Sequence, residues 1–291
     1  MKSLQGKVAV IAGATRGVGR GIAVMLGEAG ATVYCTGRSV RGNLSDMGRS
    51  ETIEETADMV SHRGGVGIPV RVDHTIENEI KALFERVQKE QNGCLDILVN
   101  DVWGGDSLTE WETPFWKHSL SNGLLMQERA VHSHIMTSHY GAPLMVARNK
   151  GLIVEITDGF DYRYRGNLYY SLAKISTIHL AAAMAEDLRP YGVTAISVTP
   201  GFLRSEAMLD HFGVTEENWQ DAVKIDPHYI ESETPFFIGQ GIAALAADPH
   251  VSEKSGEVLT SWDLSDEYGF TDIDGRRPHW GRYAAKHGFY E

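Results

Sequence analysis

The sequence has few cysteines, no long hydrophobic run and no excess of basic charge, and each absence narrows the possible functions. Its 291 residues include two cysteines, too few for the disulfide framework of a small secreted domain. No window approaches the roughly 18 consecutive apolar residues of a membrane-spanning helix. The formal net charge of −12 disfavours duplex nucleic acid and anionic membranes as partners. We therefore expect neither nucleic acid nor a membrane to be a partner.

The start of the chain lacks the features of a secretion signal. Residues Met1 to Gly6 lead directly into an apolar run, without a basic segment and an apolar core. Cys35 and Cys94 lie in or beside apolar runs, as expected of small buried residues. Unpaired buried thiols suit a reducing compartment. These observations predict a cytoplasmic protein.

Repeats, low-complexity tracts and Pro/Ser-rich linkers are also missing, and what remains is an alternation of short apolar runs with amphipathic helical stretches. Continuous apolar strands joined by helical crossovers are typical of a parallel sheet covered on both faces. We predict one α/β domain over residues 1–291, a doubly wound (Rossmann) sheet of about seven strands, with a substrate lid at 205–234 and a tail at 265–291. The predicted strands are Val8–Ala12, Thr32–Thr36, Val66–Val72, Leu95–Asn100, Leu152–Thr157, Val193–Thr199 and Glu257–Ser261.

A glycine-rich turn follows the first predicted strand and precedes a helix. In the segment Gly13-Ala14-Thr15-Arg16-Gly17-Val18-Gly19, the first glycine permits a tight turn, the second lets a pyrophosphate approach the backbone, and the third allows close packing of helix on strand. Backbone N–H groups at the helix start would then face the phosphates. In this context of strand, turn and helix, the motif predicts a dinucleotide site.

The end of the second predicted strand favours NADP(H) over NAD(H). A site for NAD(H) places an acidic residue near this strand end to bind the ribose 2′-hydroxyl, but this chain has Gly37 followed by Arg38. Arg16 and Arg41 lie nearby in sequence, and a 2′-phosphate requires cationic donors. Asp73, after the third strand, is predicted to contact the adenine.

Tyr170 and Lys174 are the candidate reaction centre. Residues four apart share one face of a helix, so both side chains can reach the same site. A tyrosine with a pKa of about 10 exchanges protons poorly at neutral pH. A fixed ammonium group would stabilise the phenolate and lower that pKa by roughly two units. The pair could then donate a proton to, or accept one from, a carbonyl or alcohol oxygen as hydride is transferred.

Together these residues resemble the short-chain dehydrogenase/reductase family, and the segments 111–114 and 263–275 resemble its dehydrogenase/reductase member-one-like branch. The resemblance implies a nicotinamide cofactor, a small-molecule substrate, a homo-oligomer (dimer or tetramer), Tyr170 as acid/base and Lys174 on the nicotinamide ribose. It also implies cofactor contacts from a further set of residues. These are Thr15, Val18, Asn100, Pro200, Gly201 and Ser205.

Two positions depart from the family pattern. Gly123 stands where a catalytic asparagine is usual, which puts the proton relay in doubt. The usual Ile-Ser-Ser is Ile156-Thr157-Asp158; counting from the strand puts Asp158 in place of the serine, whereas counting back from the tyrosine puts Thr157 there. An Asp158 carboxylate about 5 Å from the phenolate would raise its pKa by about two units. We favour Thr157 as the hydroxyl donor with Asp158 pointing aside; a protonated Asp158, or one paired with a cationic substrate, stays open.

No metal site is predicted. His132 and His134 are two apart and diverge on a helix, so neither they nor His139 suits a metal.

Taken together, these features predict an NADP(H)-dependent oxidoreductase that acts on a carbonyl/alcohol carbon or, as the lesser option, an imine/amine carbon. The rival prediction is an NADP(H)-binding protein of the same fold with little turnover. An epimerase or dehydratase is a distant third.

Overall fold

The computed structural model describes residues 2–289, built around one seven-stranded parallel sheet of order β3-β2-β1-β4-β5-β6-β7. The predicted fold class is confirmed, and the predicted strands differ from those observed by no more than two residues at either end. The strands are β1 (Val8–Ala12), β2 (Thr32–Gly37), β3 (Val66–Arg71), β4 (Ile97–Asn100), β5 (Gly151–Ile156), β6 (Val193–Thr199) and β7 (Val258–Thr260).

Burial along the strands explains why their sequences are continuous apolar runs. Every residue of β1, β4 and β6 is buried, because helices cover both faces of a parallel sheet. The edge strand β3 is largely exposed or half-buried and contains Pro69, which an edge strand tolerates because its outer N–H groups need no partner.

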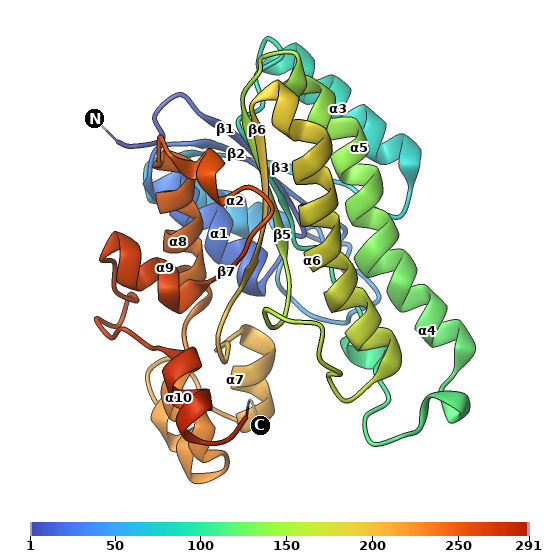
Figure 1. The fold of residues 1–291 in the computed structure, drawn as a ribbon, viewed down its shortest axis with the longest axis vertical. Helices are drawn as coiled ribbons and strands as arrows, with labels where there is room; N and C mark the ends of the chain where they lie inside the picture. The colour runs from blue at the N-terminus through green and yellow to red at the C-terminus, as the bar shows by residue number, and fades with distance from the viewer. Residues whose placement is uncertain (1, 290–291) are drawn as a thin grey trace.

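Helices cover the two faces of the sheet, as Figure 1 shows. Helices α1, α2 and α8 lie on one face, and α3, α5 and α6 lie on the other. Among the residues the structure describes, no helix is both long and apolar enough to cross a membrane. The helices are α1 (Gly17–Glu28), α2 (Ile53–His62), α3 (Glu77–Glu90), α4 (Leu120–Gln127), α5 (Ser133–Val146), α6 (Leu168–Leu188), α7 (Glu206–Phe212), α8 (Pro235–Ala247), α9 (Ser261–Tyr268) and α10 (Trp280–Lys286).

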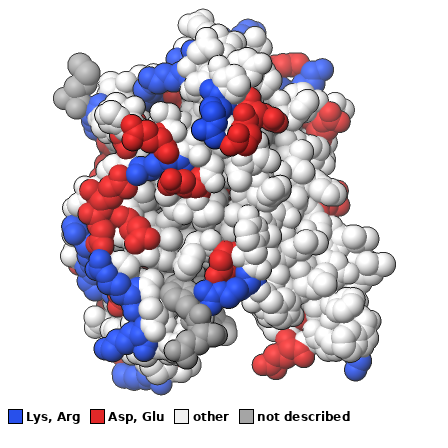
Figure 2. Space-filling view, viewed as in Figure 1, with Lys and Arg blue, Asp and Glu red and all other residues white. Residues whose placement is uncertain are grey.

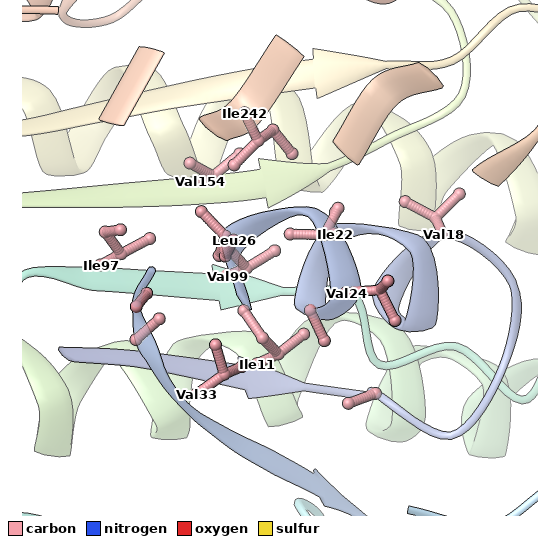
Figure 3. Packing of buried hydrophobic residues seen from close by; sticks show 14 of the residues in the cluster. Ile11, Val18, Ile22, Val24, Leu26, Val33, Ile97, Val99, Val154 and Ile242 are labelled. Carbon is pink, nitrogen blue, oxygen red and sulfur yellow. The ribbon is translucent and has the colours of Figure 1, made fainter. Parts of the chain in front are cut away.

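The larger apolar core lies between the sheet and the layer of α1, α2 and α8. Figure 3 shows Ile22 of α1 and Ile242 of α8 meeting strand residues such as Val99 and Val154. Gly21 lets the two helices approach, since a Cβ there would lie 2.0 Å from the carbonyl oxygen of Pro235. This packing fixes the start of α1 relative to the sheet, which matters because the glycine-rich turn lies there.

The chain reverses its direction of winding between β1 and β4, which are neighbours in the sheet. Successive crossovers leave this point towards opposite edges, so a crevice opens at the carboxyl ends of β1 and β4. The glycine-rich turn follows β1, and Asp101 follows β4. Ligands of doubly wound sheets bind in this position.

The segment 205–234 and the tail pack against each other near α7 and α10 (Figure 1). Residues of 205–234 form a small core of their own around Trp219 and Tyr229. The Trp219 ring lies 4.2 Å from the guanidinium carbon of Arg204 and 4.4 Å from that of Arg276, which belongs to the tail. The buried Arg204 also pairs with Asp274 at 2.8 Å. Residue 1 of the predicted domain and residues 290 and 291 of the predicted tail lie outside the described residues.

Candidate active site

The glycine-rich turn has the close backbone contacts that the motif requires. Gly13 has a φ of +94°, and a Cβ there would lie 2.5 Å from the carbonyl oxygen of Asp101. A Cβ on Gly19 would lie 2.3 Å from the carbonyl oxygen of Gly13. Gly17 has a φ of +57°, and a Cβ there would meet Ser205 Cβ at 4.0 Å, an ordinary contact distance. The first and third glycines are therefore needed for packing, and Gly17 leaves room beside the start of α1.

A cavity of about 370 Å³ begins at this turn and extends to the loop after β5. It brings together most of the residues that the sequence singled out. Those that line it are Gly13, Thr15, Arg16, Gly17, Val18, Arg38, Asp73, Thr157, Asp158, Tyr170, Lys174, Pro200, Gly201 and Ser205.

Three predicted cofactor residues do not line the cavity. Gly19 acts by packing α1 on the turn. Asn100 is fully buried behind the cavity, where its amide donates to Ser138 Oγ at 2.8 Å and to Glu155 Oε1 at 2.7 Å. Arg41 points away and pairs with Asp58 of α2. The placement of Arg41 in the cofactor site was therefore wrong, because a carboxylate on the neighbouring helix holds its guanidinium at the surface.

Two arginines remain at the end of the cavity near β2. Arg38 pairs with Asp46 at 2.7 Å, and Arg16 lies 3.4 Å from Glu51. A Cβ on Gly37 would lie 2.5 Å from Thr15 Oγ1, so an acidic side chain has no space there. Burial by itself would raise the pKa of Asp73, but hydrogen bonds from Thr75 and the positive charge of Arg38 lower it on balance.

A carboxylate of the chain itself occupies the start of α1. The N–H of Gly17 donates to Glu206 Oε2 at 2.8 Å, and the other carboxylate oxygen lies 3.5 Å from Arg20. Glu206 begins α7, directly after the predicted cofactor residue Ser205, whose side chain caps that helix. The contact places a negative charge at the start of α1, where the positive end of a helix dipole favours one.

At the other end of the cavity, the first turn of α6 positions the predicted acid/base pair. Asn167 caps the helix, its side chain accepting from the N–H of Tyr170 at 3.0 Å. Lys174 follows one turn later and lines the same cavity as Tyr170. Its ammonium group lies 4.2 Å from the centroid of the Trp103 ring and 5.7 Å from that of Tyr170.

The structure decides between Thr157 and Asp158, and the favoured option was wrong. The hydroxyl of Thr157 is buried and donates to the carbonyl oxygen of Lys174 at 2.8 Å, so it braces the helix rather than facing the phenol. The Tyr170 hydroxyl donates to Asp158 Oδ2 at 2.8 Å. Thr157 also pairs with β6 through its N–H, so the count from the strand, which put Asp158 in place of the serine, agrees with the structure.

This arrangement reverses the expected electrostatics of the phenol. Burial raises the pKa of Tyr170 well above its usual value, and the charge and hydrogen bond of Asp158 raise it further. Burial also lowers the pKa of Lys174, although Asp158 and Asp101 oppose that shift. The prediction that Lys174 makes Tyr170 markedly more acidic is therefore not what this geometry supports.

Gly123 cannot carry the missing asparagine without rearrangement. A Cβ there would lie 2.3 Å from the ring of Tyr169, which packs flat against the helix at that point. The side chain of Gln127 secures the same tyrosine by donating to its carbonyl oxygen at 2.7 Å. The side chain of Tyr169 thus takes the space that a relay side chain would need.

Sequence reasoning missed a buried polar network behind the cavity. His134 Nδ1 lies 2.6 Å from Glu155 Oε2, and its Nε2 lies 3.0 Å from the carbonyl oxygen of Val102. Both side chains are buried, and Asn100 joins them through Glu155. The only sign of this network in the sequence was Glu155, a charged residue inside an apolar strand. The network fixes the loop after β4, where burial raises the pKa of Asp101 to about 7.

The sequence predicted that His132, His134 and His139 do not form a metal site. His132 and His139 are exposed, whereas His134 is buried, so the side chains diverge as predicted. Within residues 2–289, no group of three or more His, Cys, Asp or Glu side chains is placed to hold a metal ion.

The parallel sheet, the glycine-rich turn and the Tyr170–Lys174 pair in one cavity define a class of nicotinamide-linked oxidoreductases, and comparison with known proteins agrees. Residues 7–212 match the family model for short chain dehydrogenases. The chain therefore belongs to the short-chain dehydrogenase/reductase family.

The predicted branch is confirmed as well. The chain is 38% identical over 277 residues to Dehydrogenase/reductase SDR family member 1 from Mus musculus, a match covering 94% of this chain and 85% of the relative. A short chain dehydrogenase from Mycobacterium thermoresistibile shares the fold with a TM-score of 0.77 at 22% identity, covering 96% and 92% of the two chains. A 7α-hydroxysteroid dehydrogenase complexed with NADH and 7-oxo glycochenodeoxycholic acid gives 0.71 at 27% identity, covering 88% and 93%.

Proposed function

We propose that this chain is an NADP(H)-dependent oxidoreductase that moves hydride between the nicotinamide and a carbonyl/alcohol or imine/amine carbon. The observation that carries the proposal is that Tyr170 and Lys174 line the same cavity as the glycine-rich turn. A bound nicotinamide would supply or accept the hydride. The described residues fit such a cofactor, because the N–H of Gly17 already binds a carboxylate where a phosphate oxygen would lie.

Each end of the cavity has a distinct role in this proposal. Arg16 and Arg38 would bind the 2′-phosphate, and Asp73 would contact the adenine. Lys174 would bind the nicotinamide ribose, with Ser205 near the carboxamide. Tyr170 would exchange a proton with the substrate heteroatom, and Asp158 would orient it. The segment 205–234 would act as the lid over the substrate, because α7 begins directly at the cavity.

The cofactor preference is tested by measuring NADPH and NADH binding to wild type, Arg38→Ala and Arg41→Ala. Loss of a charge-assisted pair with phosphate should weaken NADPH binding roughly tenfold in Arg38→Ala, with little change for NADH. Arg41→Ala is the matched control, because Arg41 lies outside the cavity and pairs with Asp58. Equal affinities of wild type for both cofactors would refute the NADP(H) preference.

The reaction is tested by following NADPH oxidation with ketones, aldehydes and cyclic imines. Turnover with any of them supports the proposal. A second candidate function, NADP(H) binding with little turnover, is favoured by the hydrogen bond that directs the Tyr170 proton to Asp158. Tight NADPH binding without turnover on all three substrate classes would leave only that second candidate.

We also propose a cytoplasmic homo-oligomer, a dimer or tetramer. Both cysteines are free thiols, and the face formed by α4, α5 and α6 carries few charged side chains in Figure 2. Leu120, Leu124, Ile135 and Leu172 are each about half exposed or more there, and a second copy of the chain would cover them. Leu124→Glu should lower the mass measured by light scattering, whereas Leu44→Glu, an equally drastic change in the loop after β2, should not.

A further inference from the structure

The hydrogen bond between Tyr170 and Asp158 makes proton donation to a carbonyl costly. Reducing a neutral carbonyl requires the phenolic proton to move to the new alkoxide, which leaves a phenolate 2.8 Å from a carboxylate. Two like charges that close repel even though Asp158 is exposed to solvent, and no relay side chain at Gly123 can share the proton. The centre is therefore poorly arranged for the substrate class most often associated with a catalytic tyrosine.

A substrate that is already positively charged avoids this cost. In the reduction of an iminium ion, the dihydronicotinamide gives a hydride, with its electron pair, to the C=N⁺ carbon. The C=N π electrons become the nitrogen lone pair, the substrate becomes a neutral amine, and the nicotinamide becomes a cation. No proton moves in this step. The positive charge passes from substrate to nicotinamide, so the sum of charges beside Asp158 does not change.

Charges near the reacting centre favour a cation. Asp158 and Asp106 both line the cavity, as do Asp101, whose pKa burial raises to about 7, and Arg129, which pairs with Asp46. Facing them is the ammonium of Lys174. The guanidinium of Arg165 also acts on Tyr170, but it is held by the carbonyl oxygens of Asp161 and Arg163 at 2.7 and 2.8 Å.

Aromatic rings beside the phenol supply the second element of cation recognition. Trp103 and Trp111 each lie with ring centroids 5.3 Å from that of Tyr170, at interplanar angles of 88° and 58°. Trp103 already carries the Lys174 ammonium 4.2 Å from its ring centroid. Trp111 lies just outside the residues that line the cavity, in contact with the Tyr170 ring, and is 53% exposed. An indole face next to a carboxylate is the combination that binds organic ammonium and iminium groups.

We propose that the substrates of this site are organic cations, iminium ions that are reduced to amines, with Asp158 as the counter-ion and Trp111 as an aromatic wall. This inference rests on the proposed function and narrows it to one substrate class. Tyr170 then serves to hold Asp158 in place, and its proton is not consumed.

The test compares 2-methyl-3,4-dihydroisoquinolinium, whose charge is permanent, with the neutral ketone 1-tetralone, using NADPH and the full-length chain. For wild type, kcat/KM should be at least about tenfold higher for the iminium. Asp158→Asn should lower kcat/KM for the iminium about tenfold, as expected for loss of a close charge partner, and leave or raise that for the ketone. The matched control is Asp187→Asn, because Asp187 is exposed near the far end of α6 and its loss changes net charge alone.

The variant Tyr170→Phe distinguishes iminium reduction from ketone reduction more sharply than Asp158→Asn does. Hydride transfer to the iminium needs no proton, so Tyr170→Phe should lower kcat/KM for the ketone at least about 30-fold more than kcat/KM for the iminium. Equal losses on both substrates would overturn the inference. So would reduction of the ketone but not the iminium, an outcome that leaves the proposed function standing.

A binding measurement covers the case in which neither probe is reduced. 2,2-Dimethyl-tetrahydroisoquinolinium, a stable cation, should bind the NADP⁺ complex of wild type, and Asp158→Asn should weaken that binding about tenfold in calorimetry. Absence of binding to wild type would refute the cationic substrate class. Failure of the chain to bind NADP⁺ or NADPH at all would instead refute the proposed function.

Discussion

At the scale of single residues, the pKa of Tyr170 is set by burial and by its hydrogen-bond partner Asp158. That pKa lies well above 10, first because of burial and then because of Asp158. Under the proposed function, Tyr170 would be the base when an alcohol is oxidised and would have to be a phenolate, so kcat/KM should rise with pH towards this pKa. Asp158→Asn removes the repelling charge and lowers the pKa. We expect the rising limb to move at least about one pH unit towards neutrality.

The measurement is the pH dependence of kcat/KM for oxidation of a neutral alcohol by NADP⁺, with Asp187→Asn as the charge control. If the rising part of the kcat/KM pH profile did not move in Asp158→Asn, the Asp158 carboxylate would not act on the phenol during turnover.

The position of Gly123 gives a second prediction at this scale. Restoring the family asparagine by Gly123→Asn should destabilise the protein by about 1–3 kcal/mol, because the Cβ meets the Tyr169 ring. Urea unfolding measures the loss, and Ser121→Asn, which adds the same side chain at an exposed position of α4, is the control. A variant as stable as wild type with raised ketone activity would show that the relay can be rebuilt.

The limits of sequence reasoning are clearest at single residues. The glycine-rich turn and the Tyr170–Lys174 pair were placed correctly because strand, turn and helix fix their geometry locally. Arg41 was misplaced because its partner, Asp58, lies on a separate helix. The favoured role of Thr157 was wrong, because the sequence does not show that its hydroxyl donates to the carbonyl oxygen of Lys174 on α6. The burial of His134 beside Glu155 was invisible, since it requires α5 to pack on β5.

At the scale of elements, α7 and α1 are joined by the bond from the Gly17 N–H to Glu206. A pyrophosphate and this carboxylate would compete for the same N–H groups, and both are anions. Glu206→Gln should therefore tighten NADP(H) binding, by roughly tenfold if the charge accounts for about 1.4 kcal/mol.

Fluorescence titration with NADPH provides the measurement. Glu217→Gln removes the same charge at an exposed site of the segment 205–234 and should leave the affinity unchanged. Weaker binding in Glu206→Gln would imply that Glu206 stays in contact with the turn in the cofactor complex and supports it.

The strands and helices themselves were predictable because burial on both faces imposes continuous apolar runs in β1, β4 and β6. The path of 205–234 was not, because its short helical turns carry no long hydrophobic period. Its core forms only when Trp219 and Tyr229 meet residues from Phe202 to Phe212. Such contacts are specified by tertiary packing rather than by local pattern.

At the scale of the whole molecule, Glu233 should make the free energy of unfolding decrease as the pH rises from about 4.5 to about 8. Its carboxylate accepts from the Gly201 N–H and Ser261 hydroxyl and so ties the end of β6 to α9. Burial raises its pKa from 4.5 to about 8. The folded state therefore binds a proton that the unfolded state has released between about pH 4.5 and pH 8, and the free energy of unfolding falls across that range.

Over that interval the contribution of Glu233 approaches about 1.4 kcal/mol per pH unit. Urea unfolding of wild type and Glu233→Gln at several pH values from 5 to 8 measures it as the difference between the two slopes. Parallel slopes for the two proteins would contradict the prediction.

The guanidinium groups of Arg204 and Arg276 flank Trp219 and so connect parts of the chain that are distant in sequence. Arg204 is 1% exposed and depends on Asp274 in the tail for its closest carboxylate, and its backbone neighbour is Ser205 at the cavity. A buried cation deprived of its partner destabilises its surroundings by several kcal/mol. The tail lies some seventy residues beyond the cavity wall in the sequence. Substitutions in the tail can therefore change how ligands fit the cavity, even though no residue that touches the ligand is altered.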